Sequence, residues 1–262
     1  MYNSGLLIGI FDMLNTNKLG FVNNVSAVCG ELTVGLLSDE FAEIITGQAS
    51  VISLETRMAI IQSLKNVDGV VVLNDSSDIY CFIQQTGCHL FLCDDVKTLE
   101  LNVCVNEVPS ITREIKQYDY DSVKHLSGVV GYTTGVFDLF HIGHLNLLKK
   151  AKANCDRLIV GVSTDELVKE YKGKKPVLPF SERIEIVRSI KYVDEVVKQE
   201  SMDKYEAWGK LKYNVLFHGD DWKGSQLYLE IEKKLEAVGV KMIYFPYTKG
   251  VSSTILSKKY LG

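Results

Sequence analysis

Short apolar runs alternate with amphipathic segments along much of the chain. Four of these runs are predicted as buried strands: 129–133, 158–162, 215–218 and 241–245. Leucines recur at helical spacing between lysines over 142–153, which predicts an amphipathic helix. A second helix is expected from Pro179 to Ile190, with Ser181 as its N-terminal cap. Strands that alternate with helices predict an α/β fold with a doubly wound, mostly parallel sheet, whose ligand crevice lies at the carboxyl ends of the strands.

The pattern of the second half also occurs in the first half. Gly9-Ile-Phe-Asp12 matches Gly135-Val-Phe-Asp138, 126 positions later, and the same offset aligns further pairs as far as Asp94-Asp95 with Asp220-Asp221. A constant offset without gaps over that length indicates an internal repeat. The chain is therefore interpreted as two tandem domains with a linker between them: 1–117, 129–262 and the linker 118–128.

Composition predicts a chain that is folded throughout. It is 46% hydrophobic and 24% charged, and its four prolines are scattered, so no low-complexity segment is present. The longest uncharged apolar stretch near the start, 5–11, is too short to cross a membrane and lacks the flanks of a signal peptide, so a cytoplasmic protein is expected. The six cysteines form no CxxC pair and have no matching set of histidines, so we expect neither a metal site nor disulfides.

Charge is distributed unevenly between the two halves. Residues 1–125 carry 7 Lys and Arg against 16 Asp and Glu, whereas residues 126–262 carry 22 against 17. The first half therefore has a net charge of −9 and the second half of +5. A polyphosphate ligand is expected to bind the second half. The basic residues show no arginine clustering or interleaved aromatic residues, so nucleic-acid binding is not supported.

The segment from Gly135 to His144 carries the most informative chemistry. It follows a predicted strand and enters a predicted helix, with His141 and His144 three positions apart on the first turn. Residues at this spacing face the same side of a helix. Free N–H groups and the helix dipole already attract anions at a helix N-terminus. Two histidines at this place therefore predict a phosphate site that can donate hydrogen bonds.

This segment, GxFDxxHxGH, resembles the signature of the cytidylyltransferase family of nucleotidyltransferases. The likeness continues in the same order over nearly all of 129–260. It passes through Ser163-Thr-Asp-Glu166, Lys172-Gly173, Glu182-Arg183, Lys191-Tyr-Val-Asp-Glu-Val196, Gly219-Asp-Asp-Trp-Lys-Gly224 and Tyr247-Thr-Lys-Gly-Val-Ser-Ser-Thr254. The resemblance implies two tandem Rossmann-like nucleotidyltransferase domains.

The resemblance also implies the reaction and its catalytic residues. A phosphate oxygen of a small alcohol phosphate would attack the α-phosphorus of CTP in line, and pyrophosphate would leave. His141 and His144 would bind the triphosphate and stabilise the charge that develops around the α-phosphorus. Lys172 would bridge the attacking and departing phosphates, and Mg²⁺ would accompany CTP.

Further binding residues follow from the same likeness. The nucleotide would be bound by Gly135, Val136, Phe137, Asp138, Gly219, Asp220, Thr248, Gly250, Ser252, Ser253 and Thr254. The acceptor would be bound by Lys174, Lys175, Arg183 and Trp222. Asp138 could instead cap or order a loop, Arg183 could pair with a neighbouring acid, and Trp222 could belong to the core. Tyr247 stands where the family has an arginine, a loss for which Lys249 could compensate.

The first copy lacks the residues to which the family's chemistry is assigned. Asn15 and Lys18 replace the two histidines, Thr46 stands at the place of Lys172, and Leu92-Cys93 replace His218-Gly219. The first domain is therefore expected to keep the fold and to have lost the reaction. We expect it to act as an intramolecular partner of the second domain, in a pseudo-dimer that could still assemble into a larger homo-oligomer.

The acceptor remains open between several classes. The GDDW-x-G form at 219–224 is similar to family members that act on glycerol 3-phosphate, which would serve the synthesis of a cell-surface polymer. The duplicated arrangement is similar to members that act on ethanolamine phosphate, and choline phosphate is a related possibility. The same signature also serves ATP-using enzymes that adenylylate sugar phosphates, pantetheine phosphate or flavin mononucleotide. A nucleotide-binding scaffold without activity is the alternative outside enzymes.

Overall fold

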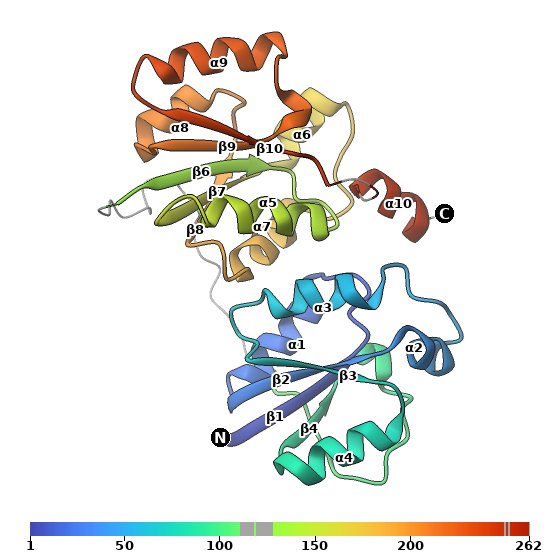
Figure 1. Cartoon of the computed structure of the whole chain (residues 1–262). Helices are drawn as coiled ribbons and strands as arrows, with labels where there is room; N and C mark the ends of the chain where they lie inside the picture. The colour runs from blue at the N-terminus through green and yellow to red at the C-terminus, as the bar shows by residue number, and fades with distance from the viewer. Residues whose placement is uncertain (111–117, 119–127, 249, 251, 262) are drawn as a thin grey trace. The chain divides into compact units, whose positions relative to one another are not determined.

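The computed structural model divides the chain into two compact units, Met1–Glu114 and Ile115–Gly262, which are described separately (Figure 1). It describes residues 1–110, 118, 128–248, 250 and 252–261. Of the predicted linker, all but Tyr118 and Gly128 lies outside the described residues, as does Lys249. Within the described ranges, no helix has the length and apolar character needed to cross a membrane.

The second unit contains a five-stranded parallel sheet. Its strands are β6 (Val130–Gly135), β7 (Arg157–Ser163), β8 (Glu195–Gln199), β9 (Val215–Gly219) and β10 (Lys241–Phe245), in the order β10-β9-β6-β7-β8. The central strand β6 pairs with both neighbours, Gly131 lying opposite Leu158 on β7 and Val215 on β9. The structure confirms all four predicted strands. Their sequences are continuous apolar runs because helices cover a parallel sheet on both faces.

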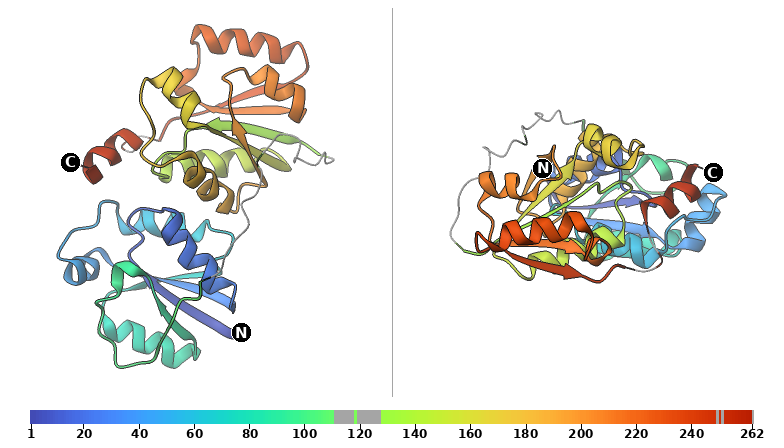
Figure 2. Two further views of the ribbon diagram at one scale, coloured as in Figure 1. Left: turned by 180° about the vertical axis from the view of Figure 1, so that it is seen from behind. Right: turned by 90° about the horizontal axis from the view of Figure 1, so that it is seen from above.

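Helices cover both faces of this sheet (Figures 1 and 2). They are α5 (Ile142–Lys152), α6 (Asp165–Lys172), α7 (Phe180–Ser189), α8 (Lys204–Leu211), α9 (Gln226–Glu236) and α10 (Ser253–Leu261), with a 3₁₀ turn, η3, at Asp220–Trp222. In Figure 1, α5 and α7 lie on one face and α8 and α9 on the other. The α/β architecture with a doubly wound parallel sheet is confirmed for this unit.

One helix boundary differs from the prediction. The helix α7 begins at Phe180 after Pro179, which has φ −63° and no side chain that can accept a hydrogen bond. Ser181 lies inside the first turn, so its predicted role as the cap is wrong. Proline is compatible with this place because its fixed φ suits entry into a helix.

The core of the second unit fixes the start of α8. Tyr132 on β6 stacks on Tyr213, with ring centroids 5.0 Å apart. A Cβ at Gly161 on β7 would collide with the hydroxyl of Tyr132, so glycine at this position makes room for the ring. The hydroxyl of Tyr213 donates a hydrogen bond to the carbonyl oxygen of Lys204 at 2.7 Å. The first residue of α8 is thereby held at the end of the sheet where the strands terminate.

The first unit has a sheet with the corresponding order. Its strands are β1 (Tyr2–Gly9), β2 (Cys29–Leu37), β3 (Gly69–Leu73), β4 (His89–Leu92) and β5 (Val105–Asn106), in the order β3-β2-β1-β4-β5, all parallel. Its helices are α1 (Thr16–Ser26), α2 (Asp39–Thr46), α3 (Leu54–Gln62), α4 (Ser76–Thr86) and the 3₁₀ turn η1 (Asp94–Val96). Among the described residues, nothing between η1 and β5 corresponds to α9 of the second unit.

The turn after the first strand has the same backbone conformation at one residue and the same side-chain contacts at the next in the two units. Phe11 and Phe137 both have φ 55°, in the left-handed region. Asp12 accepts hydrogen bonds from the N–H groups of Val51 and Ile52 at 2.7 and 3.0 Å. Asp138 accepts them from residues 177 and 178 at 2.8 and 3.0 Å. The turn that follows the first strand therefore has the same conformation in both units, as the predicted repeat requires.

Candidate functional site

A cavity of about 310 Å³ opens at the carboxyl ends of the strands of the second unit. Gly135, Ser163, Gln199 and Gly219, each the last residue of a strand, contribute to its lining. The strand order reverses next to β6, and ligands of doubly wound sheets bind in the crevice at such a point. The cavity therefore lies where the fold itself places a ligand.

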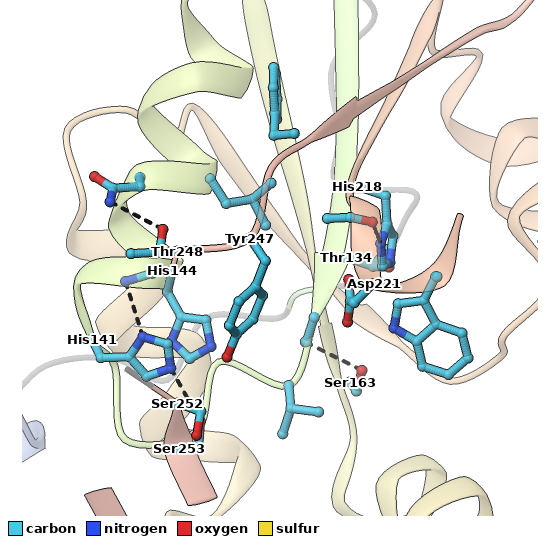
Figure 3. A pocket seen from close by; sticks show the side chains of 18 of the residues that line it. Thr134, His141, His144, Ser163, His218, Asp221, Tyr247, Thr248, Ser252 and Ser253 are labelled. Atoms are coloured by element: carbon cyan, nitrogen blue, oxygen red, sulfur yellow. Dashed lines mark hydrogen bonds between the residues drawn. The ribbon is translucent and has the colours of Figure 1, made fainter. Parts of the chain in front are cut away.

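The two predicted histidines meet at one side of this cavity. His141 is the N-cap of α5, and its Nδ1 accepts a hydrogen bond from the N–H of Gly143 at 3.1 Å. Its ring stacks on that of His144, with centroids 3.8 Å apart and planes at 19°. Because Nδ1 of His141 is an acceptor, a neutral ring carries its proton on Nε2, which lies 3.5 Å from the hydroxyl oxygen of Ser253 (Figure 3).

Burial keeps both histidines neutral near pH 7. It lowers the pKa of His141 from 6.5 to about 4. Burial lowers the pKa of His144 well below 6.5, and the neighbouring His141 and Lys172 lower it further. Nδ1 of His144 is buried and makes no hydrogen bond within the described part of the chain. Within the described residues, neither ring donates a hydrogen bond to a carboxylate. The pair can therefore donate its N–H groups to an anion.

We expect the free energy of unfolding to fall as the pH decreases from about 6.5 to about 4. A histidine in the unfolded chain titrates near 6.5, whereas His141 in the folded chain titrates at about 4, so the unfolded state binds more protons between these values. Above about 6.5 both states are neutral and this contribution is fully present. Urea unfolding of the wild type and of His141→Asn at pH 7 and 4.5 checks it. The variant should lose less stability on acidification, and equal losses would contradict the lowered pKa.

Lys172 reaches the cavity from the end of α6. Gly173, with φ +69°, ends this helix in a left-handed turn. Partial burial lowers the pKa of Lys172, and the charge of Lys174 lowers it further. Lys174 and Lys175 are exposed and do not line the cavity, so the structure does not bring these two predicted acceptor ligands into the site.

The start of α10 forms the wall beside the histidines. Ser252, Ser253 and Thr254 all line the cavity, and the hydroxyl of Ser252 accepts a hydrogen bond from the N–H of Ile255 at 3.2 Å. Thr248 also lines it and accepts a hydrogen bond from the side-chain amide of Asn146 at 3.3 Å. Two helix N-termini with hydroxyl or imidazole side chains thus converge on one side of the cavity, which suits a polyphosphate.

The other predicted nucleotide ligands divide into two groups. Gly135, Val136 and Gly219 line the cavity, whereas Phe137, Asp138, Asp220 and Gly250 do not. Asp138 is 8% exposed and orders the loop at residues 177 and 178, which is the alternative role given to it from the sequence. Asp220 accepts a hydrogen bond from the N–H of Tyr247 at 3.0 Å, and Tyr247 lines the cavity.

Arg183 is not available to an acceptor. Its side chain is fully buried and donates to the carbonyl oxygens of Val136 and Leu178 and to Asp165, at 2.5, 3.0 and 2.6 Å. Arg57 makes the corresponding bonds to Ile10 and Asp39 in the first unit. The predicted acceptor role is therefore corrected to a scaffold role, because every direction of the guanidinium group faces protein. Trp222, in contrast, does line the cavity.

Lys204 is a cavity residue that the sequence did not indicate. Its side chain is 1% exposed, and its Nζ makes no hydrogen bond to any described residue. Burial lowers its pKa to about 7. Ser163, Tyr171, Gln199, Met202, Asp221 and Tyr228 also line the cavity and were not predicted as site residues, and neither was His218 beyond its replacement by Leu92 in the first copy. All of them except Tyr171, which lies near the end of α6, are at the end of a strand, in the segment that follows one, or at the start of a helix.

The corresponding place in the first unit is filled by its own side chains. Asn15 caps α1 by accepting a hydrogen bond from the N–H of Lys18 at 2.9 Å. Lys18 forms an ion pair with Asp95, and the amide of Asn17 donates to Asp94 at 2.7 Å. The charge of Lys18, which could otherwise bind a phosphate, is thus neutralised by Asp95 within the unit. Cys93, at the place of Gly219, is fully buried.

Comparisons with known proteins identify relatives of this chain, and the family-model match lies within the second unit. A family model described as cytidylyltransferase-like matches residues 132–259. The chain is 34% identical over 137 residues to the glycerol-3-phosphate cytidylyltransferase of Bacillus subtilis, covering 50% of this chain and 95% of that protein. It is 42% identical over 116 residues to the FAD synthase of Pyrococcus abyssi, covering 43% and 77%. It is also 42% identical over 113 residues to the ethanolamine-phosphate cytidylyltransferase of Dictyostelium discoideum, covering 42% and 31%.

Proposed function

This chain belongs to the cytidylyltransferase-like family of nucleotidyltransferases, and from that premise we propose that its second unit transfers CMP from CTP to glycerol 3-phosphate, releasing pyrophosphate. The nucleophile is a phosphate oxygen that is already ionised, so catalysis requires positioning and charge stabilisation without a strong general base. The bond formed joins this oxygen to the α-phosphorus of CTP, and the bond broken joins the α-phosphorus to the oxygen of the departing pyrophosphate.

The phosphate side of the cavity suits this reaction. The N–H groups of His141 and His144 would bind the oxygens on which charge develops, and the start of α10 would bind the β- and γ-phosphates. Lys172 would lie between the acceptor phosphate and the α-phosphate. Such a preorganised donor is typically worth about 2.7–4 kcal/mol of barrier.

Mg²⁺ would enter with the nucleotide. Asp221 is the carboxylate among the described residues that line the cavity, and the described chain holds no cluster of three His, Cys, Asp or Glu suited to a metal. One carboxylate does not complete an octahedral Mg²⁺ site, so phosphate oxygens and water would supply most ligands. The ion would neutralise the charge of the departing pyrophosphate.

The choice of acceptor rests on Lys204, whose buried Nζ has no hydrogen-bond partner among the described residues and is charged once a ligand favours its protonated form. A buried ammonium without a partner costs free energy, and this cost is offset when a ligand supplies an acceptor. The same charge would repel the ammonium groups of ethanolamine phosphate and choline phosphate. A glycerol chain has hydroxyl oxygens and no cation, so Lys204 favours glycerol 3-phosphate over these two acceptors.

An acceptor screen tests this proposal. Pyrophosphate release is measured with CTP or ATP against glycerol 3-phosphate, ethanolamine phosphate, choline phosphate and flavin mononucleotide, for the wild type and for Lys204→Met. We expect the wild type to prefer CTP with glycerol 3-phosphate. Lys204→Met should raise the KM for glycerol 3-phosphate about tenfold or more, leave the KM for CTP unchanged and remain folded.

Lys210→Met is the matched control, because Lys210 lies on the same helix but is exposed and ion-paired with Glu206. It should leave both KM values unchanged. A preference of the wild type for ATP with flavin mononucleotide would replace the proposal with FAD synthesis. A preference for ethanolamine phosphate would show that Lys204 does not select the acceptor.

We also propose that the first unit is a degenerate copy that binds no nucleotide and serves as a partner of the second. The ion pair of Lys18 with Asp95 and the buried Cys93 support the loss of binding. Calorimetric titration of the full chain with CTP in the presence of Mg²⁺ should therefore give one site per chain. A stoichiometry of two would contradict the inactivity of the first unit.

A further inference from the structure

His218 lies in the cavity at the end of β9, with its ring fixed by aromatic neighbours. The ring contacts Tyr228 edge-on, with centroids 4.8 Å apart and planes at 66°. It contacts Trp222 in the same manner at 6.4 Å and 80°. All three residues line the cavity. The ring is therefore held in one orientation before any ligand binds.

The hydrogen bond made by this ring determines its tautomer. Nδ1 of His218 lies 3.2 Å from the carbonyl oxygen of Gly219. A carbonyl oxygen only accepts, so Nδ1 carries the proton and donates. Burial lowers the pKa of His218, an effect that the charge of Lys204 increases and that Gly219 and Asp221 oppose, so the ring is neutral near pH 7. Nε2 is then an acceptor, and it makes no hydrogen bond within the described residues.

The cavity therefore contains one hydrogen-bond donor and one hydrogen-bond acceptor that have no partner among the described residues. Protonated Nζ of Lys204 can only donate a hydrogen bond, and Nε2 of neutral His218 can only accept one. Both residues line the same cavity. A carboxylate or phosphate would accept a hydrogen bond from the lysine only, and an ammonium would donate one to the histidine only. A hydroxyl group meets both, because its oxygen accepts from Lys204 while its proton is donated to His218.

His218 lies away from the phosphate side of the cavity (Figure 3). In Figure 3, His141, His144, Ser252 and Ser253 form one group, and His218 and Asp221 lie in another, with Tyr247 between them. The reacting phosphates belong to the first group. We assign the second group to the carbon chain of the acceptor.

We propose that His218 is a specificity-determining residue that accepts a hydrogen bond from a hydroxyl on the acceptor's carbon chain, so that the enzyme selects the phosphomonoesters of polyols. This inference rests on the proposed function and adds the group by which its substrate class is recognised. The first unit has Leu92 at this position, which can make no such bond.

The test compares glycerol 3-phosphate with propyl phosphate, which has the same chain length and no hydroxyl groups. The kcat/KM of CMP transfer to each acceptor is measured at saturating CTP for the wild type, His218→Leu and His218→Gln. A site built to bond a hydroxyl rejects the analogue that lacks it, so the wild type should prefer glycerol 3-phosphate by about a hundredfold or more. His218→Leu should reduce this preference by about tenfold or more, with the KM for CTP unchanged.

His218→Gln keeps an acceptor oxygen and should retain more of the preference than His218→Leu. Thermal unfolding and CTP titration confirm that each variant is folded. The inference is overturned if His218→Leu slows transfer to both acceptors equally, or if it raises the KM for CTP, since the ring would then contact the nucleotide. If the wild type transfers CMP to no polyol phosphate, the proposed function itself is wrong. The wild-type measurement alone gives this result, before any variant is tested.

Discussion

Replacement of His141 by Asn is expected to lower kcat by about a hundredfold or more while the protein stays folded. The imidazole Nε2–H, which we place against the triphosphate, is lost. The cap of α5 is kept, because asparagine is a strong N-cap residue and Asn15 already caps α1 at the corresponding position. Pyrophosphate release from CTP with glycerol 3-phosphate measures the effect.

Two controls separate chemistry from folding in this experiment. His144→Ala should reduce kcat to a similar degree, because the two stacked rings act on the same phosphates. Circular dichroism and thermal unfolding at pH 7 should match the wild type for His141→Asn. Near-normal turnover in both variants would remove the histidines from the mechanism.

Replacement of Arg183 by Met is expected to lower the free energy of unfolding of the second unit by about 3 kcal/mol, at the lower end of the range for breaking a buried ion pair. The lower end applies because the side chain of Asp165 is 30% exposed, whereas that of Arg183 is fully buried. The substitution leaves two carbonyl oxygens and one carboxylate without their donor. Urea unfolding followed by tryptophan fluorescence measures this, since Trp208 and Trp222, the chain's two tryptophans, lie in the second unit.

Arg57→Met is the matched variant in the first unit, where Arg57 is equally buried. It should shift the unfolding transition seen by circular dichroism, with a smaller shift of the fluorescence transition. If Arg183→Met left the fluorescence transition in place and raised the KM of the acceptor, Arg183 would be a substrate ligand after all, and the scaffold role would be wrong.

Much of the fold was predictable from the sequence because it depends on local and periodic information. A strand covered by helices on both faces is apolar throughout, so an apolar run such as 158–162 predicts a strand. The 126-residue offset likewise marked positions that have the same backbone conformation, as at Phe11 and Phe137. His141 and His144 were predictable because helical spacing alone makes them neighbours.

The roles of the charged residues near the site depended on the tertiary structure. Sequence gives the charge of Arg183, Asp138 and Lys204 but not what surrounds each of them. Packing buried Arg183 among three acceptors and Asp138 against two backbone N–H groups, which makes both of them structural. Packing also buried Lys204 with no hydrogen-bond acceptor for its Nζ among the described residues, which leaves this group available to a ligand.

The sequence by itself thus determined four of the five strands of the second unit, the pairing of His141 with His144 on one helical turn, and the family of the second unit. Only the tertiary structure decided which polar groups are satisfied by the protein and which are left for a substrate. The physical reason is that propensity and periodicity act between residues close in the chain, whereas desolvation and hydrogen bonding depend on groups that the fold brings together from distant segments. Lys204 of α8 and His218 of β9 line the same cavity only because the sheet places the ends of its strands at one edge.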